Sequence, residues 1–330
     1  MIIFVNSKKI LLVLLAITLL MGLAGCGQST TGSVAQTTGG ELTGKITISG
    51  AWALYPMMVR WGEEFQKVHP GVQFDISAGG AGKGMTDALA GAVDIGMVSR
   101  AIMPEEEAKG AFWVPVVKDA VFVSVNEKNP VWEDLHAKGL TKEAFIGIYI
   151  TGEVTTWGQA VGRPEVTDPI HVYTRSDACG AAETWASFLG KKQEDLKGIA
   201  VYGDPGLLDA VIKDPLGIGF NNLNYLFDLS TGLPVPGARA ASIDANGNNV
   251  ADPEELVDTK EQAVAAVASG NYPSPPARDE NLVTNGKTAE GSLAKMFILW
   301  ILTDGQKFAG EAGYIALPQE QLDAVLKKLE

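Results

Sequence analysis

Between residues 45 and 100 the hydrophobic pattern changes twice from strand spacing to helix spacing, with a loop of small residues before each helix. The first strand is the alternating segment 45–49, and Pro56 suits the first turn of the following helix. The second loop, residues 79–84, reads Gly-Gly-Ala-Gly-Lys-Gly. This β-loop-α-β-loop-α-β order predicts an α/β fold with a mostly parallel sheet.

The rest of the body continues the pattern. Apolar segments rich in β-branched residues predict further strands at residues 114–125, 170–174 and 216–220. Further helices are predicted at residues 141–150, after Gly180, and at 293–302.

The first 26 residues read as an export signal. Two lysines, at positions 8 and 9, precede an apolar run from residue 10 to residue 21, which is too short for a membrane span of about 20 residues. The run leads to Leu-Ala-Gly-Cys at 23–26, which resembles the lipobox of bacterial lipoproteins and implies that Cys26 is lipidated. The alternative is a plain signal peptide with an incidental cysteine. Residues 26–44 are then the lipidated cysteine and a flexible tether, since this stretch is mostly Gly, Ser, Thr and Gln.

Composition excludes several classes of protein. The chain has 330 residues, with 26 basic and 39 acidic side chains and a formal net charge of −13. A nucleic-acid binder needs a basic surface, which this balance does not favour. Two cysteines and three histidines are too few for a disulfide framework or a histidine-built metal centre.

Three segments share one design, a strand followed by a small-residue loop and a helix start: residues 49–53, 77–84 and 175–181. Backbone N–H groups at a helix start are free and carry partial positive charge, so such ends bind oxyanions. Arg100 and Arg175 can add charged hydrogen bonds. Each loop alone is also compatible with an ordinary tight turn, and the same groups would suit a carboxylate.

The order of these motifs resembles the phosphate-type periplasmic solute-binding proteins of ABC importers. The resemblance rests on these segments: residues 50–56 with 61–65, 79–84, 94–100, Trp157, 175–177 with Gly180, 217–220, and 302–318. The resemblance implies a type II periplasmic-binding-protein fold, in which two lobes close on an anion about a hinge. It places residues 1–25 in the signal peptide, 45–118 and 272–330 in lobe I, and 119–271 in lobe II.

The resemblance also implies a ligand site, carried over position by position onto Ala51, Trp52, Ala81, Gly82, Ser99, Arg100, Arg175, Asp177, Cys179, Gly180 and Ala181. The family usually offers hydroxyl groups at several positions where this chain has alanine, tryptophan or cysteine. Some members have an aspartate at the position of Arg100. Each missing hydrogen bond to a charged ligand weakens binding by about 1.5–3 kcal/mol. Either backbone amides and arginines still hold phosphate, or the pocket prefers another anion.

Two further features leave alternatives open. Cys179 lies at a helix start, which would lower its thiol pKa, and it is either a small residue shaping the loop or a reactive group. Residues 244–255 fit the spacing of a calcium-binding EF-hand loop, or form a polar surface loop. The candidate calcium ligands are Asp244, Asn246, Asn248, Val250 through its carbonyl, Asp252 and Glu255. The acidic run 105–107 is expected to be a solvated helix start.

The sequence therefore predicts an extracytoplasmic lipoprotein, anchored to the membrane by lipid, that captures a small oxyanion such as phosphate and delivers it to an ABC permease. We expect a monomer that catalyses no reaction and requires no cofactor beyond a possible structural Ca²⁺. The alternative is a binding or signalling lipoprotein that has lost phosphate affinity. A third hypothesis is an enzyme that depends on Cys179.

Overall fold

The computed structural model describes residues 36–38 and 41–330. The predicted signal peptide, Cys26 and most of the tether lie outside these residues. Within the described ranges, no helix combines the length and the apolar character that crossing a membrane requires.

The strands and helices alternate along most of the chain. The strands are β1 Gln36–Thr38, β2 Glu41–Gly50, β3 Gly71–Ala78, β4 Ile95–Val98, β5 Ala111–Asn126, β6 Leu140–Thr141, β7 His171–Arg175, β8 Ile199–Val201, β9 Gly217–Asn222, β10 Ala238–Ala241, β11 Ile243–Asp244, β12 Ala277–Asn285 and β13 Ile315–Ala316. The α-helices are α2 Tyr55–Val68, α3 Ala81–Leu89, α4 Pro104–Ala108, α5 Trp132–Lys138, α6 Lys142–Ile146, α7 Trp157–Val161, α8 Gly180–Phe188, α9 Gly203–Lys213, α10 Leu223–Leu226, α11 Lys260–Ser269, α12 Leu293–Leu302 and α13 Gln319–Leu329. A π-helix η1 Gly147–Thr151 and two 3-10 helices, η2 Gln193–Asp195 and η3 Asp304–Phe308, complete the elements.

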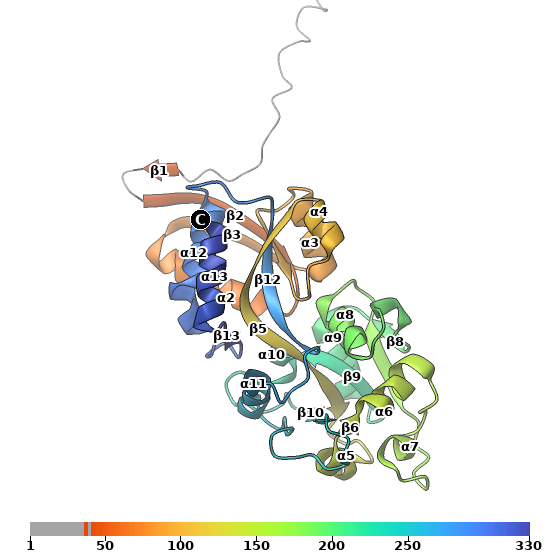
Figure 1. The fold of residues 1–330 in the computed structure, drawn as a ribbon. Coiled ribbons are helices and arrows are strands. Elements are labelled where there is room, and N and C mark those ends of the chain that lie inside the picture. Colours follow the sequence, from red (N-terminus) through yellow and green to blue (C-terminus); the bar gives the residue numbers. More distant parts are fainter. Residues whose placement is uncertain (1–35, 39–40) are drawn as a thin grey trace, which may run out of the picture. The chain divides into compact units, whose positions relative to one another are not determined.

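Eleven of the described strands form one sheet, whose main path is β1-β2-β4-β12-β5-β9-β7-β8, with β3 beside β2 and with β10 and β13 beside β5. Strands β6 and β11 form a separate parallel pair. The βα units are parallel, because β2 pairs in parallel with β3 and β4, and β7 with β8 and β9. The long strands β5 and β12 pair antiparallel with each other and run side by side through the middle of the sheet (Figure 1). The α/β fold predicted from the sequence is confirmed, with antiparallel pairs added by these two strands.

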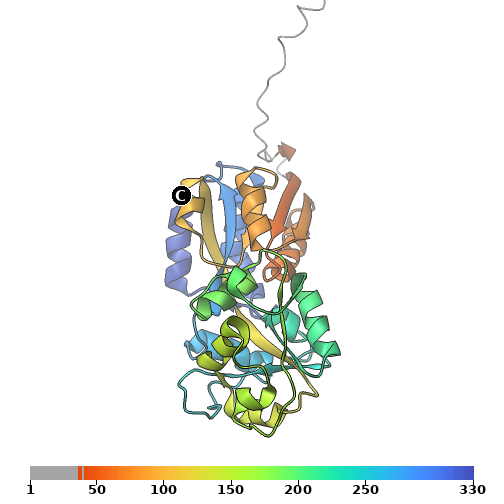
Figure 2. The same cartoon turned by 90° about the vertical axis from the view of Figure 1, so that its right-hand side faces the viewer.

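The buried side chains divide into two cores. One contains residues from 42–117 and 282–329, and the other contains residues from 120–277. We call the parts around these cores lobe I and lobe II. Helices α12 and α13 cover one face of the lobe I sheet and α3 covers the other (Figures 1 and 2). The lobe boundaries implied by the resemblance, at residues 118/119 and 271/272, stay predictions.

Helical periodicity explains the best-predicted elements. In α2, the buried residues Met58, Trp61 and Phe65 recur at steps of three and four and face the lobe I core. The indole N–H of Trp61 donates to the carbonyl of Gly305 at 2.9 Å, which ties α2 to η3. The apolar helix predicted at 293–302 is confirmed as α12.

Two buried carboxyl groups lie where β5 and β12 pair. Asp119 of β5 is opposite Arg278 of β12, and Glu280 follows two residues later; both acids are fully buried. Arg278 Nε donates to Glu280 Oε1 at 3.2 Å, and its Nη2 lies 3.7 Å from Asp119 Oδ2. Burial raises the pKa of Asp119 to about 7 and that of Glu280 to about 8, against the opposing effect of Arg278.

This acid pair should make stability depend on pH. Both folded-state pKa values exceed the unfolded values near 4, so the protonated carboxyls favour the fold at low pH and this contribution is lost as pH rises to about 8. We expect the free energy of unfolding to fall by about 1–2 kcal/mol between pH 5.5 and pH 8.5. Urea unfolding at several pH values tests this, with Glu280→Gln as the variant that should flatten the dependence. A wild-type slope that the variant leaves unchanged would contradict it.

Candidate functional site

The first loop follows β2 and leads into α2. Ala51 is fully buried, and its N–H donates to the carbonyl of Met97 at 2.9 Å. Trp52 reaches lobe II, where its ring lies edge-on to Tyr202 with centroids 6.0 Å apart and its carbonyl accepts from the hydroxyl of Tyr225 at 3.1 Å. The start of α2 has no side-chain cap. Trp52 therefore links the lobes rather than lining an open surface.

The second loop places the start of α3 against lobe II. Gly79 and Gly80 both donate N–H to the carbonyl of Gly50, and Gly80 has a φ of 95°, which favours glycine. Helix α3 begins at the buried Ala81 without a side-chain cap. The N–H of Gly82 donates to the carbonyl of Ala178 at 3.2 Å, a backbone hydrogen bond between the lobes.

The third loop brings the start of α8 to the same place. Cys179 caps this helix, its Sγ accepting from the N–H of Ala182 at 3.5 Å. Gly180 packs so tightly on lobe I that a Cβ there would lie 2.1 Å from Ser99 Oγ and 2.3 Å from the Ser99 carbonyl oxygen. The N-termini of α3 and α8, each nine residues long, thus meet across the lobes. Their partial positive charges add where they meet, which favours an anion.

Arg175 lies beside these helix starts, with its side chain wholly buried. Its Nε and Nη2 donate to the two oxygens of Asp177 at 2.8 and 2.6 Å, and its Nη1 donates to Asp204 at 2.6 Å. Asp204 also accepts from the backbone N–H of Asn222 at 3.0 Å. These bonds use three of the five guanidinium N–H groups of Arg175. The single positive charge of Arg175 is therefore paired with two carboxylates, those of Asp177 and Asp204.

Arg100 is engaged in the same way. Its Nη1 and Nη2 form a two-pronged pair with Glu106 of lobe I at 2.8 and 2.6 Å, and its Nε lies 2.8 Å from Glu183 of lobe II. The expectation that residues 105–107 form only a solvated helix start is therefore wrong for Glu106, because the Arg100 guanidinium lies within reach. The ligand positions predicted from the three loops lie together where the two lobes meet. The two predicted arginines, however, are paired there with carboxylates of the protein itself.

Cys179 departs from its sequence expectation. Burial raises the pKa of its thiol to about 12, although Arg175 opposes the shift. The predicted lowering by the helix start is wrong, because removal from water has the larger effect. A nucleophilic cysteine also needs a nearby base. The histidine closest to Cys179 in the sequence, His171, pairs with Asp214 at 2.7 Å. A thiol held protonated at neutral pH does not suit nucleophilic catalysis.

The predicted calcium loop is held by its own hydrogen bonds. The carboxylate of Asp244 accepts backbone N–H groups from Gly247, Asn248 and Asn249, and that of Glu255 accepts two more. Among the described residues, no group of three or more histidine, cysteine, aspartate or glutamate side chains is placed to hold a metal ion. Calcium binding through the oxygens of this loop stays a prediction.

Residues 35–304 match the family model of a PBP superfamily domain. The chain is 26% identical to the phosphate-binding protein PstS of Methanocaldococcus jannaschii, over 95% of this chain and 93% of that protein. It is 27% identical to PstS of Bacillus subtilis, over 71% and 77% of the two chains. The fold is similar to that of a Clostridium perfringens protein with bound phosphate, with a TM-score of 0.67, 24% identity, and coverage of 83% of this chain and all of the other.

Proposed function

Because the chain belongs to the PBP superfamily, whose model covers most of it, we propose that it is the substrate-binding component of an ABC importer. It captures a small oxyanion between its lobes, with phosphate the first candidate because relatives of similar length are phosphate-binding proteins. No bond is made or broken in this role. The ligand favours the closed state by binding it better than the open state.

One observation carries the proposal. The N-termini of α3 and α8 come from different lobes and meet through the Gly82–Ala178 hydrogen bond and the Gly180–Ser99 contact. An oxyanion bound there would contact both lobes, so its binding would stabilise the closed arrangement of the lobes. The missing hydroxyl groups at Ala81 and Ala181 imply that backbone amides supply most of the hydrogen bonds.

The cellular setting belongs to the same proposal. The lipobox-like segment ending at Cys26 supports a lipid anchor, and the following tether supports a soluble body held close to the membrane outside the cytoplasm. An ABC permease is the partner that such a receptor serves. We propose that the protein works as a monomer.

A second candidate function is supported by the paired arginines. Arg100 and Arg175 each carry two carboxylate partners, so neither presents a net positive charge to a ligand. A signalling or interaction lipoprotein that has lost phosphate affinity would tolerate this arrangement.

Native mass spectrometry and calorimetry separate the two functions. We expect protein purified under native conditions to retain an oxyanion, or to bind phosphate with one-to-one stoichiometry when calorimetry is done after dialysis. Sulfate, tungstate and small carboxylates are the comparison ligands. No retained ligand and no heat from any of them would contradict transport and support the second candidate.

A further inference from the structure

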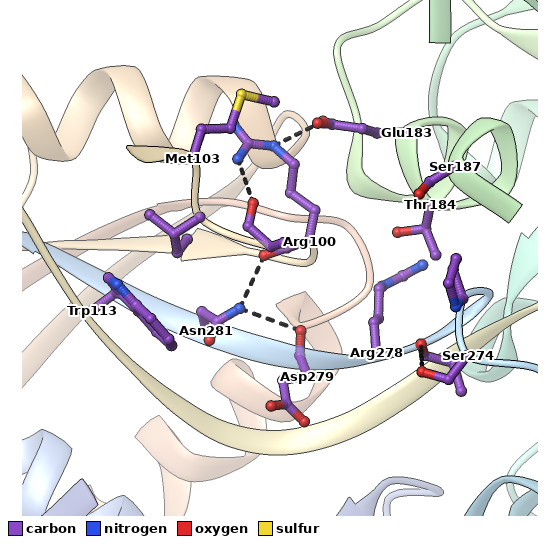
Figure 3. Close-up of a pocket in the computed structure, with 14 residues that line it drawn as sticks. Arg100, Met103, Trp113, Glu183, Thr184, Ser187, Ser274, Arg278, Asp279 and Asn281 are labelled. Carbon is purple, nitrogen blue, oxygen red and sulfur yellow. Dashed lines mark hydrogen bonds and ion pairs between the residues drawn. The ribbon is translucent and has the colours of Figure 1, made fainter. Parts of the chain in front are cut away.

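A cavity of about 480 Å³ lies between the lobes beside the paired strands β5 and β12. Its walls come from the segment after β4 in lobe I, from α8 in lobe II, and from residues 274–281. Arg100 and Glu183 face each other across this region, and a dashed line joins them in Figure 3. Both residues line the cavity, so the ion pair stands where the two lobes come together.

The hydrogen bonds of Arg100 argue against a role in binding the ligand. Nη1 donates to the carbonyl of Ala101 at 2.9 Å and to Glu106, Nη2 donates to Glu106, and Nε pairs with Glu183. Three of its five N–H groups therefore donate hydrogen bonds, and the Nε atom lies 2.8 Å from Glu183 in an ion pair. The Nε side of the guanidinium faces the Glu183 carboxylate, whose negative charge would repel an oxyanion that approached this side.

We infer that Arg100 is a positioning residue that holds the lobes closed through Glu183, and not a ligand-binding residue. This assigns a role within the proposed ligand-binding cycle to a residue that the resemblance placed among the ligand contacts. It rests on the proposed function only for the part that concerns phosphate affinity.

The two glutamates have different tasks. Glu106 is in the same lobe as Arg100, and its Oε2 also accepts from the N–H of Met103 at 2.9 Å, so it fixes the guanidinium within lobe I. The guanidinium is then already placed for the ion pair with Glu183, which lies in the first turn of α8. Because Glu106 already fixes the guanidinium, Arg100 loses little conformational freedom when its ion pair with Glu183, here called the bridge, forms.

The backbone of Arg100 is tied to the strands that connect the lobes. Asn281 of β12 donates from Nδ2 to the carbonyl of Arg100 at 3.0 Å (Figure 3). Glu183 lies one turn from Gly180, whose contact with Ser99 is the tightest between the lobes among the glycines described. The Arg100–Glu183 ion pair and the Asn281–Arg100 hydrogen bond thus connect α8 to β12 where the two lobes are in contact.

The N–H of Gly82 offers a native reporter of closure. It donates to Ala178 across the lobes, so its hydrogen exchange requires the lobes to separate. In protein freed of ligand, Glu183→Gln should speed exchange at Gly82 by about three- to tenfold, because the substitution removes a partly buried ion pair between the lobes. Glu106→Gln removes the same charge from the same guanidinium but leaves the inter-lobe partner, and should change this rate by less than about twofold. Glu165→Gln, a 64% exposed acid in lobe II, should leave it unchanged.

Phosphate affinity gives a second readout with opposite signs for the two roles. If Arg100 contacts the anion, removing Glu183 frees a donor, and Glu183→Gln should bind phosphate as tightly as Glu106→Gln or more tightly. If Arg100 acts through Glu183, as we infer, Glu183→Gln should bind phosphate about three- to tenfold more weakly than Glu106→Gln. Calorimetry on both variants measures the ratio.

Three results would overturn the inference: no protection of the Gly82 amide in the wild type, equal exchange in Glu183→Gln and Glu106→Gln, or phosphate affinity that Glu183→Gln preserves or improves relative to Glu106→Gln. If neither the wild type nor the variants bind phosphate, the proposed function fails, and Gly82 exchange in the free protein still decides the role of the bridge.

Discussion

Replacing Arg175 with methionine should lower the free energy of unfolding by about 3–5 kcal/mol. The substitution leaves the carboxylates of Asp177 and Asp204 in a buried region without their shared positive charge, and the Asp204 side chain is wholly inaccessible to solvent. An unpaired buried charge is costly because it has lost its hydration without gaining a partner. Urea unfolding followed by circular dichroism measures the change.

Arg163→Met is the matched control. Arg163 also pairs with two acids, Asp134 and Glu165, but its side chain is 44% exposed. Water can replace the lost partner there, so this variant should lose less than about 1 kcal/mol. Equal losses in the two variants would show that the burial of the Arg175 cluster does not determine its contribution.

Replacing Gly180 with alanine should weaken phosphate binding by about 100-fold without lowering the melting temperature. The added Cβ would lie 2.1 Å from Ser99 Oγ and 2.3 Å from the Ser99 carbonyl oxygen, far inside normal contact. Ser99 belongs to lobe I and Gly180 to lobe II, so the clash is relieved when the lobes move apart. The lobes themselves remain folded, but the closed arrangement that the ligand needs becomes unfavourable. Calorimetry with phosphate and a thermal melt test both parts.

Gly310→Ala is the control for this substitution. A Cβ at Gly310 would meet no atom within 4 Å, so affinity and melting temperature should both stay at the wild-type values. If Gly180→Ala retains wild-type affinity, the contact between Gly180 and Ser99 is not part of the ligand-bound state.

The elements that the sequence predicted well are those whose pattern is local. The spacing of Met58, Trp61 and Phe65 defines α2, and the continuous apolar run 293–302 defines α12. The loops before α3 and α8 were also predictable, because glycine and small residues mark places where backbone must approach backbone. The structure shows that the loop before α3 in lobe I contacts the loop before α8 in lobe II, through the Gly82–Ala178 hydrogen bond.

The ion-pair partners of the arginines could not be predicted in the same way. Asp204 lies 29 residues from Arg175 at the start of α9, and Glu183 lies in a different lobe from Arg100. Such pairs depend on how the lobes pack, for which the spacing of residues gives no signal. There was no capping signal for Glu106 in the sequence either, because Met103 stands where a capping box has Ser or Thr, although the Glu106 carboxylate accepts from the N–H of Met103.

Cys179 shows a second limit of local reasoning. A helix start lowers a thiol pKa only if the thiolate is partly hydrated or paired. The burial of Cys179 depends on the whole core of lobe II, and this burial outweighs both the helix start and Arg175.

The anomalous X-ray signal of arsenate, a tetrahedral oxyanion like phosphate, tests the central claim most directly. In crystals grown with arsenate, the claim predicts an arsenic peak between the N-termini of α3 and α8, with its oxygens within hydrogen-bond distance of backbone N–H groups of both helices. A peak at any other place between the lobes, or no peak at saturating arsenate, would contradict it.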